Sequence, residues 1–332
     1  MPFARTSKGF ARAPDPRLSG VVTTLPPGPP LLPLVATVTL NPAVDFTLTV
    51  RDFRAGAVNR VEPGGQRAGG KGVNVAAALA RAGYRVAAHG FLGRDNAALF
   101  EEFFAREGVE DRAVRLPGAT RTGFKLVDTV RGETTDLNFP GLAPDTAALE
   151  ALVATLDTTE AAWCVLAGSL PPGVPKDFYG QAVRRLRARG VKVALDASGP
   201  ALRHGLEAAP DVAKPNVHEL AGLVRSDLTD TEALVAAART FTAAGVRLVA
   251  VSRGSEGACF VTAGAVVRAR GPVLREGSTV GAGDAMVAGI VAAELAGLGL
   301  ADCARQATAY SLRALAGSGT IAEWAARVEI AG

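Results

Sequence analysis

Cysteine, histidine and long apolar runs are scarce in this sequence of 332 residues. There are only three cysteines, and Cys164, Cys259 and Cys303 lie too far apart for a disulfide framework or a cysteine-built metal site. The three histidines are equally scattered, which disfavours a metal site built on histidine. No stretch of about 18 uncharged apolar residues occurs, so we predict no membrane-spanning helix. The cysteine usage favours the reducing cytoplasm.

Lysine is also scarce, with six lysines against thirty arginines. A lysine inside a glycine-rich turn is therefore more informative here than in most chains. The net charge of +4 is carried almost entirely by residues 1–34, which contribute +3. Because the rest of the chain is close to neutral, the composition does not indicate a nucleic-acid-binding surface.

Residues 1–34 contain eight prolines and show neither a helical nor a strand period. We predict a disordered leader for this segment. A start codon assigned too far upstream would explain the same composition. From residue 35 to about residue 328 the apolar pattern becomes regular, and we predict one folded domain of the α/β class over this range.

Buried strands and helices alternate through most of the predicted domain. Val35–Leu40 is predicted to be a strand, followed by a turn, Asn41–Asp45, that delivers a carboxylate to the end where α/β proteins bind ligands. Further strands are predicted at 85–91, 112–116, 162–167, 191–196, 211–213 and 246–252, with an antiparallel pair at 258–262 and 265–270. Helices are predicted at 73–82, 95–107, 145–156, 175–189, 231–244, 279–296, 300–315 and 320–328. This order indicates a doubly wound, mostly parallel sheet flanked by helices.

Four strand-like segments fall outside this alternation. They are Thr47–Val50, Ala57–Glu62, Thr122–Asp128 and Thr134–Phe139, and the last two are joined at Arg131-Gly132 as a hairpin. We predict that they form a small lid sheet, drawn from about 46–62 and 121–140. A sheet placed over the strand ends would cover a ligand and exclude water from it.

The segment Ser278–Met286, with the sequence STVGAGDAM, opens a largely apolar helix. Thr279 can cap the helix, and Gly281 and Gly283 let a ligand approach bare backbone. Free N–H groups and the positive end of the helix dipole suit a phosphate at this place. A carboxylate in the first turn, Asp284, can take a proton from a hydroxyl that attacks the phosphate.

A second glycine-rich turn is predicted at Pro63–Asn74, with the sequence PGGQRAGGKGVN. It nearly fits a P-loop, but Gly72 stands where Ser or Thr should hold magnesium. The turn at 281–283 likewise fails the dinucleotide fingerprint, because Met286 takes the place of the third glycine. Neither standard phosphate motif is therefore predicted.

Taken singly, several candidate residues have ordinary structural alternatives. Asn216 and Glu219 could form a capping box at a helix start. Arg121 and Lys125 could be the solvated edge of a strand. Asp284 could be a partner of the helix dipole, which is the commoner role of an acid in a first turn.

Nine short motifs, taken together and in order, are far more specific. They are TLNPAVD (39–45), GGKGVNVA (69–76), GFLGRD (90–95), TRTGFKL (120–126), GSLPPG (168–173), LDASG (195–199), KPNVHEL (214–220), VSRGSEGA (251–258) and STVGAGD (278–284). This set resembles the ribokinase-like sugar kinases, and among them the phosphofructokinase-B branch. The likeness runs from about residue 35 to about residue 325 and is closest to the kinases of fructose 1-phosphate and tagatose 6-phosphate.

The resemblance implies a ribokinase-like fold, with ATP and Mg²⁺ as cofactors. Asp284 would be the catalytic base. The backbone N–H groups of Ala282, Gly283 and Asp284, in the turn that begins at Gly281, would form an anion hole for the transferred phosphoryl group. The Asn-x-x-Glu pair, Asn216 and Glu219, would hold Mg²⁺. The nucleotide-binding residues implied are Lys214, Asn216, Ser252, Gly254, Gly257 and Thr279.

The resemblance also implies a sugar site. Asp45 would accept hydroxyl groups of the sugar, and the cations Lys71, Arg121 and Lys125 would bind its phosphate. The substrate-binding residues implied are Asp45, Gly69, Gly70, Lys71, Asn74, Arg121, Lys125 and Ser169.

The expected reaction is ATP-dependent phosphorylation of a ketohexose phosphate, with D-fructose 1-phosphate giving fructose 1,6-bisphosphate as the first choice. Tagatose 6-phosphate and fructose 6-phosphate are the alternative acceptors. A non-catalytic sensor of sugar phosphates is a remote alternative. We expect small-molecule partners only, neither nucleic acid nor membrane, and a homodimer formed through the lid sheets.

Overall fold

In the computed structural model, which describes residues 32–274 and 281–332, the buried run Leu34–Thr39 forms the central strand β1. Pro33–Gly332 is one compact unit. The predicted leader, up to residue 31, and the predicted cap Thr279 lie outside the described residues. Among the described residues, no helix is long and apolar enough to cross a membrane.

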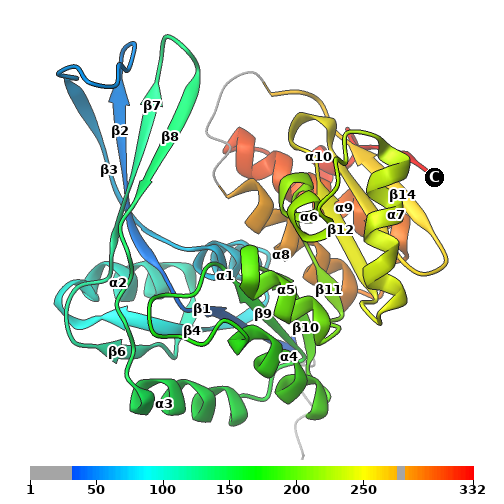
Figure 1. Cartoon of the computed structure of the whole chain (residues 1–332), viewed down its shortest axis with the longest axis horizontal. Coiled ribbons are helices and arrows are strands. Elements are labelled where there is room, and N and C mark those ends of the chain that lie inside the picture. The colour runs from blue at the N-terminus through cyan, green and yellow to red at the C-terminus, as the bar shows by residue number, and fades with distance from the viewer. Residues whose placement is uncertain (1–31, 275–280) are drawn as a thin grey trace, which may run out of the picture. The chain divides into compact units, whose positions relative to one another are not determined.

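The large sheet has 11 strands in the order β15-β14-β13-β12-β11-β10-β9-β1-β4-β5, with β6 also paired to β4 (Figure 1). Its members from β12 to β5 are parallel, and β13, β14 and β15 are antiparallel additions. The bounds are β1 (Leu34–Thr39), β4 (Arg85–Gly93), β5 (Val109–Asp111), β6 (Val114–Leu116), β9 (Trp163–Ala167), β10 (Lys192–Asp196), β11 (Val212–Ala213), β12 (Leu248–Ser252), β13 (Ala258–Val261), β14 (Val266–Arg270) and β15 (Glu329–Ala331).

Helices cover both faces of this sheet, so the predicted doubly wound fold is confirmed. Successive strand residues alternate between two apolar clusters, as Val35 and Ala36 do. The first cluster takes in α1 (Lys71–Arg81), α2 (Ala98–Glu107), α8 (Ala282–Leu295), α9 (Leu300–Ala316) and α10 (Ile321–Ala325). The second takes in α3 (Thr146–Asp157), α4 (Phe178–Ala188), α5 (Gly199–Glu207), α6 (Val217–Val224) and α7 (Thr231–Ala243). Two 3₁₀ turns, η1 (Arg94–Asn96) and η2 (Gly254–Glu256), complete the described helices.

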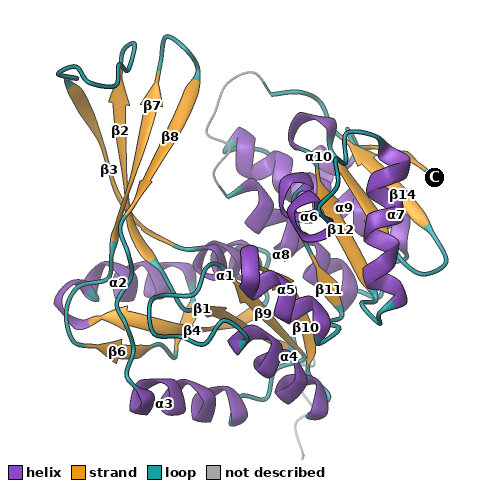
Figure 2. Ribbon diagram, viewed as in Figure 1, coloured by secondary structure: helices purple, strands orange, loops and turns teal. Residues whose placement is uncertain are grey.

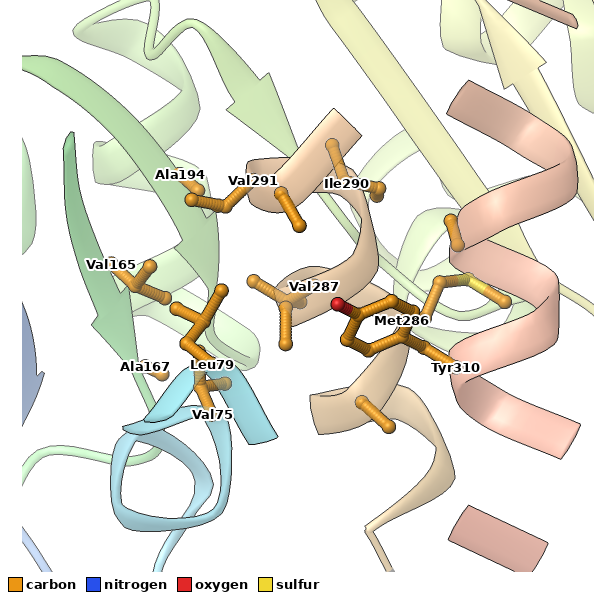
Figure 3. Packing of buried hydrophobic residues seen from close by; sticks show 14 of the residues in the cluster. Val75, Leu79, Val165, Ala167, Ala194, Met286, Val287, Ile290, Val291 and Tyr310 are labelled. Carbon is orange, nitrogen blue, oxygen red and sulfur yellow. The ribbon is translucent and has the colours of Figure 1, made fainter. Parts of the chain in front are cut away.

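Helix α8, predicted to be largely apolar, is buried all round. Residues 284–293 are all buried. Figure 3 shows why: Val287 faces Val75 and Leu79 of α1, and Met286 lies against Tyr310 of α9. A helix enclosed in this way is apolar on every side and has a fixed position in the core.

The small sheet is a separate four-stranded layer in the order β3-β2-β7-β8 (Figure 2). Its strands are β2 (Ala43–Val50), β3 (Val61–Gly69), β7 (Thr122–Asp128) and β8 (Glu133–Asn138). The predicted hairpin of β7 and β8 is confirmed as an antiparallel pair. The strand predicted at 57–62 is wrong, because β3 begins at Val61 and runs through most of the predicted glycine turn.

Pairing with β2 explains this difference. Asp45 lies opposite Arg67, and Phe46 lies opposite Gln66, so the glycine-rich segment gains ladder partners that override its turn propensity. For the same reason Asp45 lies within a strand and not in the predicted turn. The turn before α1 is confined to Gly70, whose φ of 129° is one that residues with a Cβ rarely adopt.

Short elements were missed by the sequence pattern. Helix α5 begins with Gly199-Pro200, a pair that resembles a helix breaker, although proline in the first turn removes no intrahelical hydrogen bond. Helix α6 has only eight residues, and β15 has three residues that pair with β14. The segment predicted at 112–116 is shorter, since β5 and β6 are separate strands on β4.

Candidate active site

The sheet changes its winding direction at β1, which pairs with β4 on one side and β9 on the other. Ligands of α/β proteins bind outside the carboxyl ends of the strands at such a point. Asn41 follows β1, Ser169 follows β9, and the Asn41 Nδ2 donates to Ser169 Oγ at 3.1 Å. The predicted residue Ser169 therefore lies at the switch point, next to Asn41.

The start of α8 presents a carboxylate beside free backbone N–H groups. Gly281 is the N-cap in the left-handed conformation, with φ 82°, and its carbonyl accepts from the N–H of Ala285 at 2.8 Å. The N–H groups of the residues between them have no acceptor within the helix. Asp284 is buried, and its Oδ2 accepts from Asn74 Nδ2 at 2.7 Å. The predicted base, its anion hole and Asn74 thus come together from segments 210 residues apart.

The surroundings of Asp284 give its carboxyl group a pKa that would suit a general base. Burial and the nearby Asp196 raise its pKa to about 6, although Asn74, Lys71 and Lys214 act in the opposite direction. A general base works best when its pKa lies near the operating pH. The carboxylate can therefore be ionised near neutral pH and still accept a proton readily.

A fully buried acid, Asp196 at the end of β10, joins two lysines. Its Oδ1 accepts from Lys71 Nζ at 2.7 Å, and its Oδ2 lies 3.4 Å from Lys214 Nζ. Burial alone would raise the pKa of Asp196, but the two ammonium groups outweigh it and lower the pKa below its ordinary value. The pKa of Lys71 is raised, since Asp196, Asp284 and Glu219 outweigh the effect of its burial.

This arrangement brings two cations to the start of α8. A Cβ added at Gly283 would lie 3.3 Å from Lys214 Nζ, so that ammonium lies directly beside the predicted anion hole. Lys214 itself is 3% exposed. Lys71, predicted to bind the phosphate of the sugar, donates to Asp196 and lies close enough to Asp284 for its charge to be felt.

The sugar-side acid, Asp45, is held in a cradle made by two glycines. A Cβ at Gly69 would lie 2.4 Å from Asp45 Oδ2, and one at Gly123 would lie 3.0 Å from its Oδ1. Lys125 Nζ and Arg67 Nη2 are each 3.9 Å from the same Oδ2. Burial raises the pKa of Asp45, and these two cations and Arg121 oppose the rise.

Arg121 precedes β7 and connects the small sheet to the switch point. Its guanidinium donates to the carbonyl of Asn41 at 3.2 Å, to Asn138 Oδ1 at 3.3 Å and to the carbonyl of Phe139 at 3.2 Å. Burial lowers its pKa, and Asp45 acts against that change. The structure thus brings together Asp45, Lys125 and Arg121, three residues that the resemblance assigned to the sugar.

A cavity of about 790 Å³ lies beside the amino end of α8, where Ala282 and Gly283 form part of its wall. This volume is in the range of small-molecule and cofactor sites. Four residues predicted to bind nucleotide contribute to the lining: Asn216, Ser252, Gly254 and Gly257. The lining also includes apolar residues, which suit an aromatic base: Leu228, Val273, Leu274, Met286, Leu312 and Leu315.

The predicted metal pair also has a structural role. Asn216 Oδ1 accepts from the N–H of Glu219, and Glu219 Oε2 accepts from the N–H of Asn216, both at 2.8 Å, so they form the capping box of α6. The second carboxylate oxygen of Glu219 is not used by this box. Within the described ranges, no cluster of three or more Asp, Glu, His or Cys could hold a metal ion. A Mg²⁺ ion here would take few protein oxygens and rely on water and phosphate, as is usual for nucleotide sites.

Three residues of the site were not assigned from the sequence. Asp196 stands in the motif LDASG, and its burial between two lysines depends on the strand order. Arg67 looked like part of a loop until pairing placed it opposite Asp45. Asn41 follows the buried strand β1, and a polar residue at that position could have been recognised in the sequence as a candidate for the site.

Comparisons with known proteins identify the family of this chain. The profile of the pfkB family carbohydrate kinases matches residues 34–326. A 1-phosphofructokinase of Rhodobacter capsulatus is 51% identical over 284 residues, covering 85% of this chain and 90% of the relative. Two structures of phosphofructokinase-2 from Escherichia coli, one in complex with fructose-6-phosphate and one a tetrameric inhibited form, give TM-scores of 0.81 and 0.82. They are 26% and 27% identical, and each match covers 89% of this chain and 99% of the other. The chain therefore belongs to the pfkB family of carbohydrate kinases.

Proposed function

We propose that this chain phosphorylates D-fructose 1-phosphate to fructose 1,6-bisphosphate, with ATP as donor and Mg²⁺ as the metal. The observation that carries the proposal is the pairing of a tuned carboxylate, Asp284, with the free N–H groups of the α8 start. The name of the 51% identical relative supports fructose 1-phosphate as the acceptor. The cations around Asp45 support an acceptor that already carries a phosphate.

The phosphoryl group would pass at the start of α8. Asp284 would remove the proton of the attacking sugar hydroxyl, and the N–H groups of Ala282 and Gly283 would face the charge that spreads over the transferred group. Lys71 and Lys214, fixed by Asp196, would add positive charge there. Asn74 would hold Asp284 in the orientation needed to face the hydroxyl.

ATP would occupy the cavity of about 790 Å³, with its phosphates toward Ala282 and Gly283. Mg²⁺ would be bound by the phosphates and by Glu219, directly or through water, with Asn216 fixing the Glu219 side chain. When bound, the ion neutralises part of the phosphate charge and orients the leaving group. Gly254 and Gly257, both with positive φ, would let the nucleotide lie close to the backbone.

The sugar would lie between Asp45 and Asp284, with its phosphate among Arg67, Arg121 and Lys125. We expect kcat/KM to be highest for fructose 1-phosphate and lower for tagatose 6-phosphate and fructose 6-phosphate. A coupled assay of ADP formation with the three sugars at equal Mg-ATP measures this order. A higher kcat/KM for either 6-phosphate would change the acceptor while leaving the kinase chemistry in place.

The pKa of Asp284 predicts an acid limb in the rate. Below a pH of about 6 the free enzyme holds Asp284 protonated, so kcat/KM should fall about tenfold per pH unit as the pH decreases further. Above that pH the carboxylate is ionised and the rate should level off. Because phosphate monoesters titrate near the same pH, the control is the residual rate of D284N. An identical acid limb in that variant would assign the titration to the substrate.

For assembly, we propose a homodimer formed through the small sheets. The outer strand β8 is exposed along its length; Leu137 within it and Phe139 just after it are 50% and 56% exposed. Apolar groups on a sheet edge favour pairing with a second chain. Light scattering on the eluted protein should give twice the chain mass of 33.9 kDa, and the monomer mass alone would contradict this assembly. The place of action we propose is the cytoplasm, in keeping with the free cysteines.

A further inference from the structure

A second cavity, of about 470 Å³, is bounded by the end of β3 and by helices α1, α2, α8 and α9. Small residues form much of its wall, so no side chain fills it. They are Ala77, Ala78, Gly281, Ala285, Ala314 and Gly317. A volume of this size is enough for a small metabolite. In the packing of Figure 3, α1, α8 and α9 lie together along this side of the core.

Arginines from four different elements line this second cavity. They are Arg67 of β3, Arg81 of α1, Arg106 of α2 and Arg313 of α9, with Glu102 as the acid among the lining residues. Arg81 is engaged by both oxygens of Glu107, at 2.7 and 2.8 Å, and is chiefly structural. The other three keep N–H groups for a ligand.

The contacts that these arginines make within the protein still leave their guanidinium groups able to bind an anion. Arg106 lies over the Phe103 ring at 5.3 Å, and its Nε is 3.7 Å from Glu107, which Arg81 already occupies. Arg313 donates from Nε to the carbonyl of Gly319 at 3.1 Å, using one of its five N–H groups. Guanidinium groups bind phosphate through paired hydrogen bonds.

Two lining residues also belong to the active site. Asn74 donates to the catalytic carboxylate Asp284 at 2.7 Å, and the Arg67 guanidinium is 3.9 Å from Asp45. A negative group in the second cavity would attract Arg67 and compete with Asp45 for it. Occupancy of the cavity would therefore be communicated to the sugar side of the active site through a shared side chain.

We propose that the second cavity is a regulatory site for a small phosphorylated metabolite. The phosphate is held by Arg106, Arg313 and Arg67, and the body of the metabolite lies on the small-residue wall. Binding draws Arg67 from Asp45 and raises KM for the sugar phosphate, with little change in kcat. The coupling to KM, though not the binding itself, rests on the kinase function proposed above.

The test uses inorganic phosphate as the probe and the full chain with its active site filled. The protein is saturated with fructose 1-phosphate and Mg²⁺ plus the β,γ-imido analogue of ATP, and phosphate is titrated by calorimetry at constant ionic strength. The wild type should bind phosphate at one remaining site. The double variant R106Q/R313Q should bind it at least about tenfold more weakly, because two charge-assisted contacts are lost.

The matched control is R184Q/R239Q, which removes the same charge from exposed positions on α4 and α7. It should bind phosphate like the wild type. Without phosphate, R106Q/R313Q should keep wild-type kcat and KM, and added phosphate should no longer raise its KM. The single variant R106Q gives the same comparison if the double variant does not fold. Equal phosphate binding in both double variants, or no phosphate binding by the wild type together with no effect of phosphate on its KM, would overturn the proposal and leave the kinase function untouched.

Discussion

Replacing Asp284 with Asn should lower kcat by about 10²–10⁴-fold, because the hydroxyl of the sugar loses the group that accepts its proton. The variant keeps the size of the side chain and a carbonyl oxygen that can still accept from Asn74. Asp284 is absent from the lining of the 790 Å³ cavity, so Mg-ATP should bind with nearly unchanged affinity. Steady-state turnover and calorimetric titration with Mg-ATP measure the two quantities separately.

Asp302 provides the matched control for this experiment. It is an exposed acid in the first turn of α9, as Asp284 is a buried acid in the first turn of α8. If Asp284 served only the helix dipole, D284N and D302N would have similarly small effects. We expect normal turnover from D302N and strongly reduced turnover from D284N. Near-normal turnover in D284N would contradict the assignment of the base.

Binding of sugar phosphate by the wild type with no ADP formed would favour the sensor alternative.

Long periodic segments made the main architecture predictable. The strands β1, β4, β9, β10 and β12 are apolar runs separated by helical patterns, and two-sided burial gives them that composition. The β7–β8 hairpin was predicted from alternation and the Arg131-Gly132 turn. These signals are local, so they can be read from the sequence without knowing the tertiary contacts.

The errors lie where partners far along the chain decide the local structure. Glycines at 64, 65 and 69 favoured a turn, but pairing with β2 made the segment strand β3. Arg67 became a site residue only through that register. The contact between Lys71 and Asp196 was likewise not predicted, because it depends on the strand order β9–β10. Spacing along one segment cannot encode such contacts.

Asp196→Ala should destabilise the fold by about 3–5 kcal/mol, because it leaves the ammonium of Lys214 buried without its partner. Lys214 is 3% exposed, and Asp196 is fully buried. Denaturation in urea at neutral pH should show the loss as a lower midpoint with a similar slope. The exposed acid Glu150 on α3 is the control, and E150A should change the free energy of unfolding by less than about 0.5 kcal/mol.

The cause can be separated from simple loss of packing with a second change. If the unpaired ammonium is responsible, D196A combined with K214M should be more stable than D196A alone, since the methionine removes the buried charge. A double variant no more stable than D196A would assign the loss to the cavity left by the carboxylate. The pKa of Asp196 is lowered in the folded state, so its contribution is present above its ordinary value of 3.8 and is lost as the pH falls through the folded-state value. The difference between the wild type and D196A should therefore shrink in acid, and a constant difference down to the acid transition would argue against the ion pair as its source.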